Sequence, residues 1–177
     1  LKHTFSNFAL NDHLKIVPLN VLDKPGLESI ATKFNFIFHA AGPQERDIVL
    51  NYPLEVIDAN IDGLRSCLDF LRTQEQVHRV RGRLIVFSSL TIYGNNYGNK
   101  VVTITEDETN LTSTIEDKAS VYSESKRMAE VITKAYHRTY GLDYVICRLS
   151  TIYGYSKNPT KTAFFEFLED SKKGKNI

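Results

Sequence analysis

The sequence has no excess of charge of either sign, few cysteines and no long apolar run. It carries 22 Lys and Arg against 21 Asp and Glu, a formal net charge of +1, so nothing indicates nucleic acid or a membrane surface as partner. No apolar run approaches the ~20 residues of a spanning helix, and residues 1–10 lack the apolar core of a signal peptide. Cys67 and Cys147 have neither CxxC nor metal-ligand spacing. We therefore expect two reduced, buried thiols, no metal site and a cytoplasmic protein.

The composition that is present is ordinary for a globular protein. Hydrophobic residues make up 42% of the 177 positions and charged residues 24%, which is enough apolar content for a core. At roughly 100–200 residues per domain, the length predicts one domain or part of a larger one.

Short apolar runs alternate with longer segments of helical periodicity. This alternation predicts βαβ units and a parallel sheet, in which ligands bind beyond the carboxyl ends of the strands. The polar segment 95–119 is expected to be a long loop. The expected strands are 14–19, 35–39, 83–87 and 144–148, and the expected helices are 25–33, 53–71, 121–140 and 162–173.

An identical tetrapeptide follows two of the expected strands. Thr-Ile-Tyr-Gly occurs at 91–94 and again at 151–154, with no further identity around it. We interpret the pair as two similar strand-end turns at the same edge of the sheet rather than as a repeat.

Tyr122 and Lys126 lie four residues apart in an expected helix, so both side chains share one face. A free tyrosine has a pKa near 10, and a fixed cation beside it favours the phenolate. Lowering that pKa to ~7 needs roughly 4 kcal/mol, of which one lysine supplies part. Such a pair suits proton transfer to or from a sugar hydroxyl. The alternative is a solvated helix face, and Tyr153 and Lys157 have the same spacing within a turn.

Three neighbouring features add to this pair. Ser88 and Ser89 end an expected strand at the ligand edge, where a hydroxyl could bond the same substrate oxygen. Residues 40–42 are Ala-Ala-Gly, which lets a cofactor approach the backbone closely. Asn60 lies in a largely apolar helix, where an amide is more often packed or capping than functional.

Six ordered segments resemble one family, the extended short-chain dehydrogenase/reductases of the NAD-dependent nucleotide-sugar epimerase/dehydratase group. The resemblance includes Phe-Ile-Phe-His-Ala-Ala-Gly, the strand that ends in Ser-Ser, and Tyr-x-x-x-Lys-x-x-x-Glu. The six segments are residues 36–42, 58–63, 84–94, 104–107, 122–130 and 148–154.

The resemblance implies a fold and a set of roles. The fold would be a doubly wound, Rossmann-like parallel α/β sheet binding NAD, with NADP possible. Tyr122 would be the general acid/base, Lys126 would lower its pKa and bind the nicotinamide ribose, and Ser89 would hold the reacting oxygen. Asn60 would complete the catalytic tetrad by positioning. The implied cofactor residues are also Asn20, Val21, Ala40, Ala41 and Gly42, and the implied substrate contacts are Ser89, Thr91 and Thr151.

Two departures from the family pattern qualify these roles. No GxxGxxG or GxGxxG phosphate-binding loop occurs, and the first segment already resembles the family's third strand. We therefore expect residues 1–177 to be a partial domain, with N-terminal strands and a substrate lobe outside this sequence. Leu90 and Thr91 also stand where the family's dehydratases carry acids, which disfavours dehydration and decarboxylation.

The leading hypothesis is therefore an epimerase or reductase of a nucleotide-activated sugar that works through a transient keto sugar. A dehydratase or decarboxylase of the same family is the second candidate. A non-catalytic NAD(P) sensor or scaffold is a third, of a different class. The resemblance also implies a homodimer through helices 53–71 and 121–140.

Overall fold

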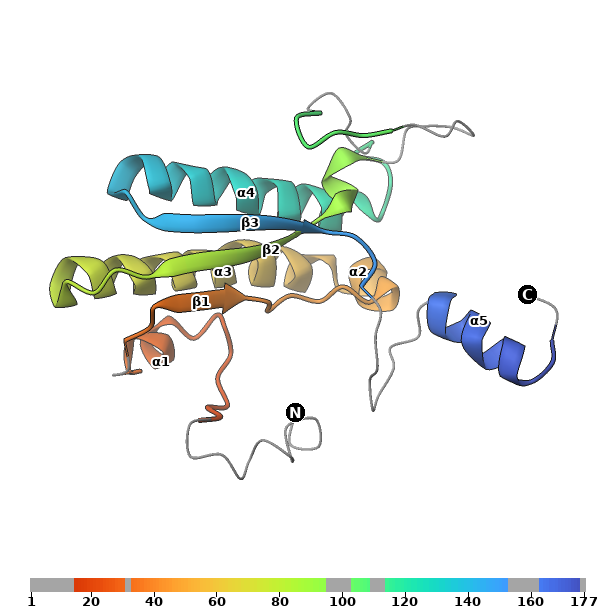
Figure 1. Cartoon of the computed structure of the whole chain (residues 1–177), viewed down its shortest axis with the longest axis horizontal. Coiled ribbons are helices and arrows are strands. Elements are labelled where there is room, and N and C mark those ends of the chain that lie inside the picture. The colour runs from red at the N-terminus through yellow and green to blue at the C-terminus, as the bar shows by residue number, and fades with distance from the viewer. Residues whose placement is uncertain (1–14, 31–32, 95–102, 109–113, 153–162, 176–177) are drawn as a thin grey trace. The chain divides into compact units, whose positions relative to one another are not determined.

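Three parallel strands form the sheet of the computed structural model, which describes residues 15–30, 33–94, 103–108, 114–152 and 163–175 (Figure 1). The strands are β1 (Phe36–His39), β2 (Arg83–Ser89) and β3 (Asp143–Leu149), and their order in the sheet is β1-β2-β3. Because all three run in one direction, their carboxyl ends meet at one edge of the sheet, which is where a parallel sheet binds ligands.

Six helices occur in the described residues besides these strands. Asp23 caps the first helix by accepting a hydrogen bond from the Gly26 amide at 3.0 Å. Gly141 ends the fourth α-helix in a left-handed conformation, with φ of 74°, as a glycine at that position allows. The helices are α1 (Lys24–Glu28), α2 (Arg46–Asn51), α3 (Pro53–His78), the 3-10 helix η1 (Leu90–Tyr93), α4 (Ser120–Tyr140) and α5 (Ala163–Lys172).

The core lies between one face of the sheet and the two long helices. Figure 1 shows α3 and α4 running along this face. Leu64, Leu68 and Leu71 of α3 pack there against Leu84 and Val86 of β2, and all five are at most 1% exposed. Every third or fourth residue of α3 thus reaches the sheet, which explains why helical periodicity predicted this element.

The opposite face of the sheet is apolar and exposed in the described chain. Phe36 and Phe38 of β1 are 59% and 62% exposed, and Val145 of β3 is 39% exposed. An apolar strand such as 35–39 is typical of a sheet covered on both faces, but α3 and α4 cover only one face of the described sheet.

The expected strand 14–19 is also wrong. Residues 15–19 form no strand, and Ile16 and Val17 are 47% and 46% exposed. A strand needs a neighbour for its backbone hydrogen bonds, and no strand of the described chain pairs with this segment. An apolar run alone could not show whether such a neighbour exists.

The other expected elements are confirmed, most with small shifts of their ends. The helix expected at 53–71 continues to His78, and the helix expected at 25–33 ends earlier, at Glu28. Two short helices, α2 and η1, were not predicted, because six and four residues show no period. The parts of the 95–119 segment that the structure describes, 103–108 and 114–119, contain no helix or strand, and its remaining residues lie outside the described ones.

Both cysteines are free thiols, as expected, although only Cys67 is buried and Cys147 is partly exposed. The chain divides into two units: residues 19–150 form one, and the described residues before 19 and after 150 belong to the other, which contains α5. Among the described residues, no helix is both long and apolar enough to cross a membrane.

Candidate active site

Polar side chains that are almost fully buried gather at the carboxyl end of β2. Ser88 and Ser89 end the strand at 4% and 8% exposure, Lys126 of α4 is 8% exposed, and Asn60 of α3 is 1% exposed. Burying polar groups is costly unless they are hydrogen-bonded. The sequence therefore predicted a group of residues that the fold does bring together.

Lys126 is held directly against the strand. Its Nζ donates a hydrogen bond to the Phe87 carbonyl oxygen at 2.9 Å and lies 5.7 Å from the centre of the Tyr122 ring. Burial lowers the pKa of Lys126 to about 8, so the ammonium form still predominates at neutral pH. The fold thus fixes one positive charge beside the phenol.

Burial raises the pKa of Tyr122 above its ordinary value, and a hydrogen bond with Ser89 opposes that rise. Lys126 is not among the causes that act on this phenol. The predicted lowering of the tyrosine pKa by the lysine is therefore not what the described surroundings produce. A phenolate base would need further positive charge close by.

Ser89 is oriented by the residue two positions later. Its Oγ accepts hydrogen bonds from the Thr91 amide at 3.2 Å and from the Thr91 hydroxyl at 3.0 Å, which caps η1. A serine hydroxyl has one proton to donate. Since both bonds from Thr91 are accepted, the Ser89 proton remains available for the Tyr122 oxygen or for a reacting oxygen beside it. Thr91 thus orients the Ser89 hydroxyl, in addition to lying next to the site.

Asn60 is buried with half of its amide unpaired. Its Nδ2 donates to the Ser125 hydroxyl at 3.0 Å, and that hydroxyl donates to the Tyr122 carbonyl at 2.9 Å. Its Oδ1 has no hydrogen-bond partner among the described residues. A Cβ at Gly42 would come within 2.5 Å of this oxygen and 3.8 Å of Lys126 Nζ. The unpaired oxygen therefore faces the small-residue turn that follows β1, next to the lysine.

The other predicted cofactor residues lie in two places. Ala40, Ala41 and Gly42 follow β1, and Gly42 has φ of 154°, a conformation that side-chain-bearing residues rarely adopt. Asn20 forms a turn in which its Oδ1 accepts from the Leu22 amide at 3.0 Å. Val21 packs against Gly63 of α3, where an added Cβ would meet Val21 at 2.7 Å. The roles of Asn20 and Val21 toward adenine stay predictions.

A cavity of about 230 Å³ opens beside the phenol. Tyr122 and Thr91 line it together with Gln44 and Arg46. Sequence reasoning missed these last two residues because they belong to α2 and the turn before it, which carry no periodic signal. Thr151, the other predicted substrate contact, belongs to the second unit, so its role stays a prediction.

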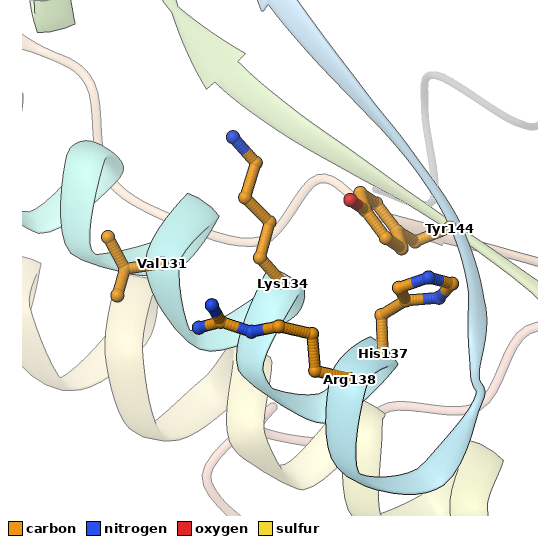
Figure 2. A pocket seen from close by; sticks show the side chains of 5 residues that line it. All are labelled: Val131, Lys134, His137, Arg138 and Tyr144. Atoms are coloured by element: carbon orange, nitrogen blue, oxygen red, sulfur yellow. The ribbon is translucent and has the colours of Figure 1, made fainter.

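A larger cavity, of about 290 Å³, lies along the second half of α4 and contains none of the predicted site residues (Figure 2). The larger cavity is lined by Val131, Lys134, His137, Arg138 and Tyr144.

No group of three or more His, Cys, Asp or Glu that could hold a metal occurs in the part of the chain that the structure describes.

A parallel sheet with a buried serine, a buried lysine and a half-buried tyrosine at its carboxyl edge defines a Rossmann-like protein of the dehydrogenase/reductase type. The chain belongs to the NAD dependent epimerase/dehydratase family, whose model matches residues 2–177. The family membership that the sequence motifs suggested is therefore confirmed.

Relatives and solved structures agree with this family. The chain is 28% identical over 144 residues to UDP-glucuronate 4-epimerase 4 of Arabidopsis thaliana, covering 81% of this chain and 30% of the relative. It is 24% identical over 145 residues to a UDP-N-acetyl-alpha-D-glucosaminuronate decarboxylase of Bacillus cytotoxicus, covering 82% of this chain and 42% of that protein.

Among solved structures, UDP-glucose 4-epimerase of Thermotoga maritima has a TM-score of 0.76 at 23% identity. UDP-glucuronic acid 4-epimerase of Bacillus cereus, solved with NAD, has a TM-score of 0.74 at 18% identity. These likenesses show the fold. The chain spans 52% and 51% of these two structures, which cover 95% and 99% of it, respectively.

Proposed function

We propose that this chain carries the acid/base residues of an NAD-dependent epimerase or reductase acting on a nucleotide-activated sugar through a transient keto sugar. The observation that carries the proposal is the cluster of Ser89, Tyr122 and Lys126 at the ligand edge of the sheet, with Ser89 hydrogen-bonded to the phenol. A protein that only binds a dinucleotide has no use for this trio.

The residues present fit the nicotinamide side of an NAD molecule. The unpaired Asn60 Oδ1 and the Lys126 ammonium both face the turn at Gly42, where a side chain would fill the space. Ribose hydroxyls can both donate to such an oxygen and accept from such an ammonium. When bound, NAD supplies the hydride acceptor and, in its oxidised form, a second positive charge. NADP remains the alternative cofactor.

The proton steps fall to the protein. Tyr122 takes the proton of a sugar hydroxyl when the carbon that bears it loses hydride, and returns the proton when hydride comes back. Because burial raises the pKa of Tyr122, the phenolate would need the second positive charge of oxidised NAD beside the Lys126 ammonium. Ser89 would donate its hydrogen bond to the reacting oxygen, which stabilises negative charge as it develops there.

Dehydration and decarboxylation are less favoured by the site. Both residues that follow Ser89 in η1, Leu90 and Thr91, lack an acidic group, and Leu90 is 44% exposed. Among the described residues that line the cavity beside Tyr122, none carries a carboxyl group. An elimination of water would need a general acid that the described site does not offer.

The proposal is tested by incubating the full-length protein with NAD and either UDP-glucuronate or UDP-glucose and separating the products. We expect the C4 epimer of at least one of them. Tyr122→Phe should lower kcat by about 10²- to 10⁴-fold and spare NAD binding. Tyr144→Phe, in the cavity away from the site, is the matched control and should be active.

Three other outcomes separate the remaining candidates. Accumulation of a keto sugar with an equal amount of NADH would indicate net oxidation, which is a reductase reaction run in reverse, and loss of carbon dioxide from UDP-glucuronate would indicate a decarboxylase. NAD binding with no conversion of either sugar would favour the sensor or scaffold. Full activity in Tyr122→Phe would remove the tyrosine from the mechanism.

We also propose that the protein is cytoplasmic, because its two free thiols stay reduced there. We further propose a homodimer formed through α3 and α4. Both helices carry exposed apolar residues three positions apart: Leu54 (72%) and Ile57 (38%) on α3, and Met128 (50%) and Val131 (49%) on α4. Sedimentation of the full-length protein should show a dimer that Met128→Lys converts to a monomer. A wild-type monomer would refute the proposal.

A further inference from the structure

We propose that Glu130 and Arg148 are positioning residues, which hold Ser89 in register with Tyr122 by clamping the chain on both sides of Ser89. The inference rests on the proposed function, because it assigns a role in turnover to an ion pair that touches none of the reacting atoms. Sequence reasoning noted both residues only as motif positions.

The first clamp joins α4 to the end of β2. Glu130 lies two turns beyond Tyr122 and one turn beyond Lys126, on the same face of α4, and is 5% exposed. The Ser88 hydroxyl donates to Glu130 Oε1 at 2.6 Å. Together with the bond from Lys126 to the Phe87 carbonyl at 2.9 Å, this fixes α4 to two consecutive residues of β2. The next residue of the strand is Ser89.

Arg148 completes the clamp from the neighbouring strand. Its Nε donates to Glu130 Oε1 at 3.0 Å and its Nη2 to Oε2 at 2.9 Å. Two parallel bonds from a planar guanidinium fix orientation as well as distance. Residue 148 is near the carboxyl end of β3, where Ser88 pairs with it in register. The carboxylate therefore ties β2, β3 and α4 together one residue from Ser89.

The second clamp lies after Ser89. The Nη1 atom of Arg148 donates to the Tyr93 hydroxyl at 2.7 Å and to the Glu106 carbonyl at 2.7 Å. Tyr93 ends η1, the helix that Ser89 caps. Ser89 is thus held between Ser88, bound to Glu130, and Tyr93, bound to Arg148. The bond to the Glu106 carbonyl also attaches the polar segment that follows η1 to Arg148.

An ion pair that only joined the strands would not need this burial. Arg83 and Asp143 already join β2 to β3 at their other ends, with Nε to Oδ2 at 2.7 Å and side chains 47% and 52% exposed. Glu130 is instead buried, at an expense in desolvation that a surface pair avoids. Both are arginine–carboxylate pairs that hold β3, but Arg83 and Asp143 join β3 to β2 far from Ser89, whereas Arg148 and Glu130 join β3 to α4 beside it. The exposed pair therefore serves as a control for the buried one.

The test compares Glu130→Gln and Arg148→Lys with Asp143→Asn and Arg83→Lys in the full-length protein. Turnover of whichever UDP-sugar the wild type converts is measured per molecule competent to bind NAD. We expect kcat to fall about tenfold or more in the first pair, which corresponds to about 1.4 kcal/mol in the barrier, with KM changed less than about twofold. The second pair should keep wild-type kcat.

A purely structural role gives a different result. If Glu130→Gln and Arg148→Lys only lower the melting temperature, kcat per NAD-competent molecule stays at the wild-type value and the proposal is overturned. If these variants do not fold, Ser88→Ala decides, since it removes a single bond: a several-fold loss of kcat supports the clamp, and an unchanged kcat rejects it. A wild-type protein that converts no UDP-sugar would instead refute the proposed function.

Discussion

Two buried amides on helix α3 differ in how completely they are hydrogen-bonded. Gln74, 3% exposed, lies toward the amino ends of the strands and makes three bonds: it accepts from the Phe34 amide at 2.7 Å and donates to the Phe34 and Val80 carbonyls at 2.9 and 3.1 Å. Asn60, 1% exposed, donates one bond and leaves Oδ1 unpaired among the described residues.

The same difference separates the two ends of the sheet. At the amino ends of β2 and β3, the ion pair of Arg83 and Asp143 is exposed. At the carboxyl ends, Ser88, Ser89 and Lys126 are nearly buried. A buried polar group that is fully bonded needs no explanation beyond stability, whereas an unpaired one calls for a bound water, a ligand or a catalytic role. The end that carries the unpaired amide is therefore the end where we propose the function.

The largest predicted effect is at the functional end. Ser89→Ala removes the donor to the reacting oxygen, and we expect kcat to fall about 10²- to 10³-fold. Because the bond from Ser89 lowers the pKa of Tyr122, its loss raises that pKa and moves the acid limb of the pH–rate profile to higher pH. Ser66→Ala, a buried serine that bonds its own helix at Asp62, is the control and should leave both kcat and the limb unchanged.

The next prediction concerns pH and His39, at the carboxyl end of β1. Burial, with a contribution from Lys126, lowers the pKa of His39 to about 4 from 6.5. The unfolded chain thus binds a proton more readily than the folded chain, so this contribution to stability is present above pH 6.5 and is lost as the pH falls toward 4. The loss is roughly 3 kcal/mol.

Urea unfolding of the full-length protein at several pH values checks this. Between pH 6.5 and 4, the unfolding free energy should fall less in His39→Asn than in the wild type, whatever the stability of the variant at pH 7. An equal slope in wild type and variant would show that His39 does not titrate with unfolding.

Loss of the Gln74 amide should affect stability more than turnover, and loss of the Asn60 amide should affect turnover more than stability. Gln74→Leu leaves three backbone groups without partners, and we expect it to lower the free energy of unfolding by about 2–3 kcal/mol while kcat per folded molecule is kept. Asn60→Leu loses one bond, so it should cost about 1 kcal/mol and lower kcat and NAD affinity. Denaturant unfolding and NAD titration separate the two, and the reverse pattern would break the comparison.

The smallest effect is expected at the exposed ion pair. Arg83→Ala should change the unfolding free energy by less than about 1 kcal/mol, because exposed pairs are screened by water. Turnover should be unchanged. A loss of kcat here would mean that both ends of β2 and β3 matter for the reaction.

The sequence predicted the elements that have a strong period or a clear end. Helix α4 was expected at 121–140 and runs from Ser120 to Tyr140, with Gly141 as its C-terminal cap. Ser89, Tyr122, Lys126 and Asn60 were named from strand ends and motif spacing, and the fold brings them together. The strand expected at 14–19 failed because apolar runs say nothing about pairing partners.

The sequence by itself determined the family, the parallel sheet and which residue types stand at its ligand edge, because these follow from local periodicity and from motifs in order. Only the tertiary structure decided which neighbours each of those groups meets. It raised the pKa of Tyr122 by burial, left Asn60 Oδ1 unpaired among the described residues, and joined Ser88, Glu130 and Arg148 across two strands and a helix. Burial and long-range hydrogen bonds depend on packing between distant segments, which spacing along the chain does not specify.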